Sequence, residues 1–280
     1  MDNTIKTVLI FVSRKHPLGQ QVRRDILQWL KKQSIKTIDA SDSSGRLSEK
    51  ATRGVDVAVC VGGDGTFLRL IRRLETKDLF PIMGVNLGTL GFITEIPIDH
   101  WQGVLERVLQ GRYLEQSRRL LHVELWRNGK LKEAGTAFND VVITKDATTS
   151  MIRFKISMGD ESLISVRADG YVVATSTGST AYSLSAGGPI VHPEVSGMLL
   201  TAICPHTLSA RPFILPESAE IMVEPSDYQG KAYLVYDGLI NYELAPQDTL
   251  RVRLSSMALR LVRFPNMRWS ETIRSKLNLF

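Results

Sequence analysis

One carboxylate, Asp64, stands among three glycines in the segment VGGDGTFLRL (61–70). Such glycines let the backbone approach a ligand, and the helix predicted to follow offers free N–H groups and a positive dipole end to phosphate. A carboxylate repels phosphate, so Asp64 suits this place only if it holds a metal ion or accepts a proton from a hydroxyl that attacks phosphorus. A plain tight turn capped by Asp64 is the alternative.

A second polar segment, ATSTGSTAYSLSAGGPIV (174–191), gathers serine and threonine hydroxyls around Gly178. Hydroxyls and backbone amides at this density can bind phosphate, ribose or an adenine edge without adding charge, and Tyr182 could stack on a base. A polar surface loop is the plain alternative. Upstream, FNDVVI (138–143) places Asn139 and Asp140 beside a β-branched strand, where they either form a turn or hold two sugar hydroxyls.

The elements that must position these residues alternate in the first third of the chain. Apolar strands are predicted at 7–12, 56–61 and 81–86, and amphipathic helices at 18–30, 67–74 and 101–109. Continuous apolar strands separated by helices are typical of a parallel sheet covered on both faces, in which ligands bind at the carboxyl ends of the strands. The glycine loop lies at such an end.

The pattern changes near residue 112. Alternating strands predict hairpins around Asn128 and Gly129 and around Gly159 and Asp160, and strand and turn signals continue to about residue 264. We therefore expect an α/β domain with a parallel sheet over 1–112 and a β-rich domain over 113–263. The stretch RWSETIRSKL (268–277) again has a helical pattern.

Composition limits the class of protein. The 280 residues carry a net charge of +6, and no apolar run is long enough to cross a bilayer. The first residues lack a signal-peptide cleavage site, which favours a soluble, cytoplasmic protein without a membrane partner. Cys60 and Cys204 have no metal-binding spacing and are expected to be buried and reduced. The basic residues are scattered, which argues against a nucleic-acid partner.

Taken together, the motifs identify a family. VGGDGTFLR, GVNLGTLGF, FNDVVI, RADGYVVAT, STGSTAYSLSAGGPIV, CPHTLSARP and RWSETIRSKL resemble, in the same order, the bacterial-type NAD kinases. The GGDGT loop alone is also similar to that of diacylglycerol and sphingosine kinases, the wider superfamily. The resemblance implies an α/β domain, a β-rich NAD-binding domain, and a tail (264–280) that returns to the first. It implies transfer of the γ-phosphoryl group of ATP, with a divalent metal such as Mg²⁺, to the adenosine 2′-hydroxyl of NAD.

The same resemblance assigns roles to residues of this chain. Asp64 matches the catalytic aspartate, which resembles a general base on the ribose hydroxyl. The other positions that match NAD contacts are Gly65, Arg69, Asn139, Asp140, Ser150, Arg167, Asp169, Thr180, Ala181, Tyr182, Ser183, Leu184 and Ser185. No residue is assigned to a metal, because the cation is expected to arrive on ATP. The family also implies a homotetramer or homodimer in which a neighbouring chain helps to complete the nucleotide site.

This chain departs from the family pattern at two positions. Ser176 replaces a common proline, and Leu239 follows Asp237 and Gly238 where a polar residue is usual, so we expect altered discrimination at that end of the dinucleotide. Three alternatives stay open: a lipid kinase of the same superfamily, which would need an apolar acceptor pocket, a catalytically silent NAD-binding regulator, and a basic nucleic-acid-binding module.

Overall fold

The structure is a computed structural model that describes residues 5–13, 16–41, 45–74, 80–88, 91–265 and 268–277, with the backbone alone at 240 and 241. Two residues of the predicted loop at 86–92, Thr89 and Leu90, lie outside the described residues. The chain forms two compact units. The first comprises Met1–Ser117 and Leu259–Phe280, and the second comprises Arg118–Ala258.

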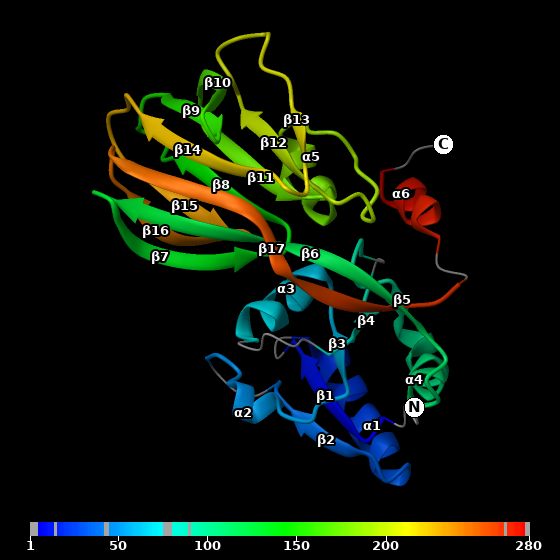
Figure 1. Cartoon of the computed structure of the whole chain (residues 1–280). Coiled ribbons are helices and arrows are strands. Elements are labelled where there is room, and N and C mark those ends of the chain that lie inside the picture. Colours follow the sequence, from blue (N-terminus) through cyan, green and yellow to red (C-terminus); the bar gives the residue numbers. More distant parts are fainter. Residues whose placement is uncertain are drawn as a thin grey trace. The chain divides into compact units, whose positions relative to one another are not determined.

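The first unit is an α/β domain (Figure 1). Its elements are β1 (Thr7–Val12), α1 (Pro17–Lys32), β2 (Lys36–Asp39), α2 (Glu49–Thr52), β3 (Val57–Val61), α3 (Asp64–Arg73), β4 (Ile82–Asn86), β5 (Ile96–Pro97), the 3₁₀ turn η1 (Ile98–His100), α4 (Trp101–Leu109) and α6 (Trp269–Leu277). Strands β2, β1, β3 and β4 are neighbours in that order, and every pairing among them is parallel.

Burial explains why these strands are continuous apolar runs. All residues of β1, β3 and β4 are buried. Alternate strand residues, such as Val8, Ile10 and Val59, share a core with Ile26 of α1 and Leu105 of α4. The predicted parallel sheet is confirmed, and the glycine loop lies at the carboxyl end of β3, directly before α3.

The second unit is antiparallel. Its elements are β6 (Leu114–Arg127), β7 (Lys130–Ala137), β8 (Asp140–Lys145), β9 (Ile152–Met158), β10 (Glu161–Ala168), β11 (Gly170–Thr175), the 3₁₀ turn η2 (Thr177–Thr180), α5 (Tyr182–Ser185), β12 (Gly197–Ile203), β13 (Phe213–Pro216), β14 (Glu220–Ser226), β15 (Ala232–Tyr236), β16 (Leu239–Leu244) and β17 (Asp248–Arg263). Strands β6 and β17 begin or end in the first unit.

Two layers of strands enclose the core of this unit. One sheet has the order β13-β12-β11-β8-β15-β16, and the other layer includes β10-β9-β14-β17 with the β6-β7 hairpin. Phe154 of β9 and Tyr171 of β11 share one hydrophobic cluster, and the centroids of their rings lie 5.6 Å apart. Asn128 and Gly129 both have positive φ in the turn between β6 and β7, as the sequence predicts for a tight hairpin.

The expectation for the two cysteines is half right. Cys60 is buried in β3, where burial raises the pKa of its thiol. Cys204, which has a φ of 47° just after β12, is exposed, so the expectation that it is buried was wrong. Within the described part of the chain, no helix has both the length and the hydropathy to span a bilayer.

Candidate active site

The glycine loop between β3 and α3 is shaped by close packing at one end and open space at the other. A Cβ atom at Gly62 would lie 2.4 Å from the Thr66 hydroxyl oxygen, so only glycine fits. A Cβ atom at Gly63 or Gly65 would meet nothing within 4 Å. These two glycines therefore border open space at the N-terminus of α3, where free N–H groups and the helix dipole favour an anion.

Asp64 opens α3, and its carboxylate is held by the segment 91–94. Oδ2 accepts a hydrogen bond from the Phe92 backbone N–H at 2.8 Å. Oδ1 accepts three, from the backbone N–H groups of Ile93 at 3.2 Å and Thr94 at 3.0 Å and from the Thr94 hydroxyl at 2.9 Å. Gly91 makes room for this arrangement, because a Cβ atom there would lie 1.9 Å from Asp64 Oδ1.

A buried amide supports this segment. Asn86 ends β4 and donates from Nδ2 to the Thr94 hydroxyl oxygen at 2.8 Å and to the Thr94 carbonyl oxygen at 3.2 Å. Its Oδ1 accepts from the Gly88 backbone N–H at 2.7 Å. Asn86 is 3% exposed and Thr94 is fully buried. The motif GVNLGTLGF (84–92) contains Asn86 and ends two residues before Thr94. Neither residue was selected from the sequence as a functional residue.

Arg69 extends from the exposed side of α3. Its guanidinium donates to the Ser13 hydroxyl at 3.1 Å. The side chain thus reaches the residue that follows β1, beside the carboxyl end of β3 in the parallel pair. An arginine at this edge of the sheet is available to an anionic ligand.

In the second unit, Asn139 and Asp140 are held by one carboxylate. Asp237 accepts from three consecutive backbone N–H groups, those of Phe138 at 2.9 Å, Asn139 at 2.7 Å and Asp140 at 3.2 Å. Asp237 has a φ of 45°, in the turn between β15 and β16. On the other side, Thr175 donates from its hydroxyl to the Phe138 carbonyl oxygen at 2.8 Å. The segment is therefore fixed from both neighbouring strands.

The side chains of Asn139 and Asp140 are not satisfied in the same way. The buried Asn139 Oδ1 has no hydrogen-bond partner among the described residues. Burial, followed by the negative charge of Asp237, raises the pKa of Asp140 to about 7, although the backbone N–H of Tyr182 acts in the opposite direction. An unpaired acceptor and a carboxyl group that is partly protonated near neutral pH are thus adjacent, and both are suited to polar ligand groups.

The serine and threonine segment after β11 uses much of its polarity within the fold. Ser179 donates to the Ser176 carbonyl oxygen at 2.7 Å, and the buried Ser183 hydroxyl lies 3.1 Å from that of Thr201. Thr180 donates to the Thr177 carbonyl oxygen at 3.3 Å. Tyr182, by contrast, is exposed, as expected for a ring that stacks on a base. The other candidates here are the half-buried Ala181 and Leu184 and the exposed Ser185.

Asp169 lies at the other end of β8. The register pairs Asp140 with Ala174 and Thr144 with Gly170, so Asp169 adjoins the end of β8 that is remote from Asp140. Asp169 faces Lys145 Nζ at 3.5 Å. The five-residue step from Asp140 to Lys145 is about 17 Å in an extended strand.

The last two candidates, Ser150 and Arg167, are both exposed. The Ser150 hydroxyl accepts from the Gln229 backbone N–H at 2.9 Å. The Arg167 carbonyl oxygen accepts from the His206 N–H at 2.9 Å. The structure therefore brings Asn139, Asp140 and the 180–185 segment together, whereas Ser150, Arg167 and Asp169 each contact other residues.

Leu239, where the family usually has a polar residue, begins β16 with a half-exposed side chain. It follows Asp237 and Gly238, which both have positive φ. Its effect on ligand discrimination stays a prediction. Asp237 itself was noted only as a neighbour of Leu239, because its three backbone contacts join it to residues about 100 positions away.

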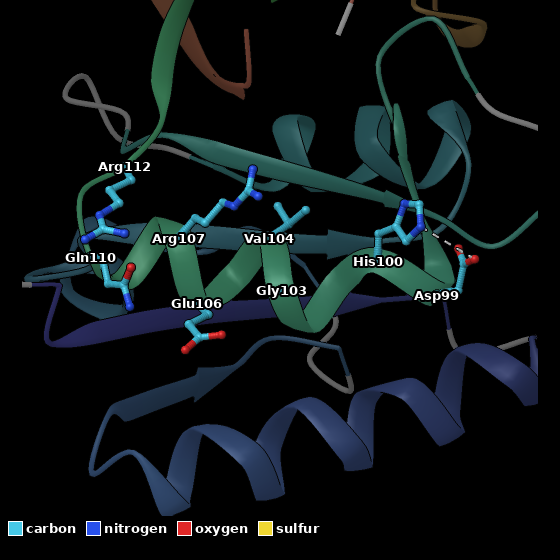
Figure 2. A pocket seen from close by; sticks show the side chains of 8 residues that line it. All are labelled: Asp99, His100, Gly103, Val104, Glu106, Arg107, Gln110 and Arg112. Carbon is cyan, nitrogen blue, oxygen red and sulfur yellow. Dashed lines mark ion pairs between the residues drawn. The ribbon is translucent and has the colours of Figure 1, made fainter. Parts of the chain in front are cut away.

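A groove lies along α4, and its lining is defined by described residues (Figure 2). It has a volume of about 670 Å³, and the described residues that line it include none of the candidates. Its charged side chains, from Asp99 to Arg112, carry both signs and are spread along the helix rather than converging on one point. The described residues also contain no group of three or more His, Cys, Asp or Glu side chains suited to a metal ion.

Two family models match this chain. The ATP-NAD kinase N-terminal domain matches residues 10–113, and the ATP-NAD kinase C-terminal domain matches residues 138–264. The chain belongs to the NAD kinase family. It is therefore a phosphotransferase, and its activity is that of an NAD kinase.

Curated relatives agree over nearly the full length. The NAD kinase of Geobacter metallireducens is 36% identical, with 98% of each chain covered, and that of Syntrophotalea carbinolica is 34% identical over the same shares. Among solved structures, a yeast NADH kinase complexed with NADH has a TM-score of 0.89 at 26% identity and covers 99% of this chain and 88% of its own. The NAD kinase fold of two domains, one α/β and one β-rich, is thus confirmed.

A more distant structure shows the same fold. An NAD kinase from Archaeoglobus fulgidus in complex with ATP has a TM-score of 0.72 at 23% identity, with 99% of this chain and 97% of that chain covered. Both structures cover 99% of this chain, so both of its units have counterparts in solved NAD kinase structures.

Proposed function

We propose that this NAD kinase transfers the γ-phosphoryl group of ATP to the 2′-hydroxyl of the adenosine ribose of NAD, giving NADP and ADP, with Asp64 as the general base. The observation that carries the proposal is the position of Asp64, a carboxylate at the N-terminus of α3 beside two glycines that border open space. The helix amides stabilise phosphate oxygens, and the carboxylate accepts the proton of the attacking hydroxyl.

Timing of the proton transfer follows from the chemistry of the acceptor. An alcohol is too weak an acid to lose its proton before it attacks, so in a loose phosphoryl-transfer transition state the base accepts the proton late. Most of the rate then comes from holding the hydroxyl and the phosphorus in line. A carboxylate fixed by four hydrogen bonds, as Asp64 is, suits a role in which position matters more than basicity.

The second unit supplies the dinucleotide contacts in this proposal. Asn139 Oδ1 is a buried acceptor with no partner among the described residues, and Asp140 is a carboxyl group that can donate or accept near neutral pH. Together they fit a nucleoside, whose amine and hydroxyl groups need both kinds of partner. Tyr182 offers an exposed ring for stacking on the base. Gly65, Arg69, Ser150, Arg167, Asp169 and the remaining residues of 180–185 are proposed as further contacts.

A divalent cation fits this chain as a companion of the nucleotide rather than as a resident of a protein cage. The described residues hold no cluster of three potential ligands, and three of the four hydrogen bonds to Asp64 already fall on Oδ1. We therefore propose that Mg²⁺ arrives bound to the triphosphate, where it neutralises charge on the phosphate oxygens.

Two further properties belong to the proposal. We infer that the enzyme acts as a homotetramer or homodimer, as the family resemblance implies, and that a partner chain contributes to the nucleotide site. We also expect a cytoplasmic enzyme, in keeping with Cys60 and Cys204 as free thiols.

The test is product formation by the purified protein. With NAD, ATP and Mg²⁺ we expect a product that an NADP-specific dehydrogenase accepts, which reports phosphate on the 2′-hydroxyl. NADH, polyphosphate and diacylglycerol serve as alternative substrates. Phosphorylation of diacylglycerol in place of NAD would favour the lipid kinase, whereas NAD binding without turnover with any donor would indicate the silent regulator.

A further inference from the structure

We propose that Thr94 is a positioning residue for the reaction: its hydroxyl, oriented by Asn86, fixes the Asp64 carboxylate so that Oδ2, not Oδ1, receives the proton of the acceptor hydroxyl. This inference rests on the proposed role of Asp64 as the general base. Thr94, Asn86 and Asp64 all belong to the first unit, and Thr94 is fully buried.

The two oxygens of Asp64 are occupied unequally. A carboxylate offers about four lone-pair sites, two on each oxygen. Oδ1 accepts hydrogen bonds from Ile93 N, Thr94 N and Thr94 Oγ1, so its capacity is used. Among the described residues, Oδ2 accepts a hydrogen bond from Phe92 N alone, at 2.8 Å, which leaves it a lone pair. The next proton donor to approach, such as a substrate hydroxyl, is therefore directed to Oδ2.

The direction of the Thr94 hydroxyl follows from its two partners. Ionised Asp64 can only accept, so the proton between the two side chains comes from Thr94 Oγ1. Asn86 Nδ2 lies 2.8 Å from the same oxygen and donates to it. The orientation of the Asn86 amide is set in turn, because its Oδ1 accepts from Gly88 N at 2.7 Å. A chain of donors thus runs from Asn86 through Thr94 to Asp64.

Burial makes this series of hydrogen bonds stiff. Thr94 is 0% exposed and Asn86 is 3% exposed, so water does not replace either bond. Gly91 approaches both groups closely, since a Cβ atom built there would lie 1.9 Å from Asp64 Oδ1 and 2.6 Å from Thr94 Oγ1. Without the Thr94 hydroxyl, Oδ1 keeps only its two backbone N–H donors, and the carboxylate loses the contact that ties it to the Asn86 amide, so it can turn more freely. A misplacement of about 1 Å can lower turnover by roughly a hundredfold.

Two matched pairs of variants isolate the hydroxyl. Thr94→Val keeps the shape of threonine, including the methyl group near Gly84, and removes the hydroxyl. Thr94→Ser keeps the hydroxyl and removes the methyl group, and Thr94→Ala differs from it by the hydroxyl alone. We expect kcat to fall about tenfold or more in Thr94→Val, with the KM for NAD changed less than about twofold. Thr94→Ser should recover most of the lost turnover, and Thr94→Ala should not.

The contrary outcomes are distinct. Wild-type kcat in Thr94→Val, or equal turnover in Thr94→Ala and Thr94→Ser, would overturn the inference. Loss of NAD affinity in parallel with kcat in Thr94→Val would instead assign Thr94 a merely structural role. If Thr94→Val does not fold, the serine and alanine pair decides by the same two constants. An active Asp64→Asn enzyme would contradict the proposed base, whereas an inactive one beside a fully active Thr94→Val would reject the positioning role alone.

Discussion

At the residue scale, the neighbouring carboxyl groups of Asp140 and Asp237 have different environments and different roles. Asp237 accepts three backbone N–H bonds, which suit a charged carboxylate. Asp140 is buried beside that charge, and both effects raise its pKa, to about 7. Near neutral pH, Asp140 thus holds a proton in part of the molecules, beside the negative charge of Asp237. Asp140 can then offer a hydrogen-bond donor that a fully ionised carboxylate lacks.

This arrangement predicts a pH-dependent stability that Asp140→Asn removes. Because the pKa of Asp140 rises from 3.8 when exposed to about 7 when folded, its contribution to stability is fully present below about pH 3.8 and is lost as the pH rises through about 7. Melting temperatures measured from pH 4 to pH 8 should fall less steeply for the variant than for the wild type. Asp160→Asn, in an exposed turn, is the control. Parallel curves for wild type and Asp140→Asn would contradict the shift.

Some functional residues are readable from the sequence and others are not. Asp64 was found because a carboxylate is unexpected in an anion loop. Thr94 and Asn86 carried no such signal, because a buried threonine or asparagine has many possible partners and theirs are set by the fold. The serine and threonine segment gave a strong signal, yet Ser179 and Ser183 bond within the protein. Hydroxyl density predicts polarity but not which hydroxyls face a ligand.

At the scale of elements, β11 and η2 hold the Asn139 segment by direct backbone contact. The Gly178 N–H donates to Thr175 Oγ1 at 3.0 Å, and the Thr175 N–H donates to the Asn139 carbonyl oxygen at 2.8 Å. A Cβ atom at Gly178 would lie 2.0 Å from that same carbonyl oxygen. The clashing atom belongs to the backbone, so relief requires a shift of β11 or of the Asn139 segment.

Gly178→Ala should therefore destabilise the fold and weaken NAD binding together. We expect a loss of about 1–3 kcal/mol in the free energy of unfolding, the usual range for overpacking, measured by urea denaturation. Gly103→Ala on α4 is the matched control, because its Cβ meets nothing within 4 Å and alanine favours a helix. Equal stability of Gly178→Ala and wild type would show that the two segments are not in contact.

The sequence predicted the long elements better than the short ones. The helix expected at 101–109 coincides with α4, and the strand expected at 7–12 coincides with β1, because burial dictates their apolar patterns. Strand β2 was not predicted. It has four residues, lies at the edge of the sheet and is exposed or half-buried throughout, so its sequence KTID has little apolar signal.

At the scale of the whole molecule, two strands continue across the division into units. The division falls at Ser117 and Arg118, within β6, and at Ala258 and Leu259, within β17. A turn signal cannot mark a boundary inside a continuous strand. The sequence nevertheless predicted an α/β part followed by a β-rich part, because the change from helical to alternating periodicity reflects which faces are buried.

The central claim is that Asp64 accepts the proton of the 2′-hydroxyl on the adenosine ribose of NAD during phosphoryl transfer. The most direct measurement is single-turnover NADP formation by Asp64→Asn beside the wild type, with NAD affinity determined by calorimetry on both proteins. The account predicts NAD binding within about threefold of wild type and a loss of turnover of about a hundredfold or more. Turnover near the wild-type rate in a correctly folded Asp64→Asn enzyme would contradict it.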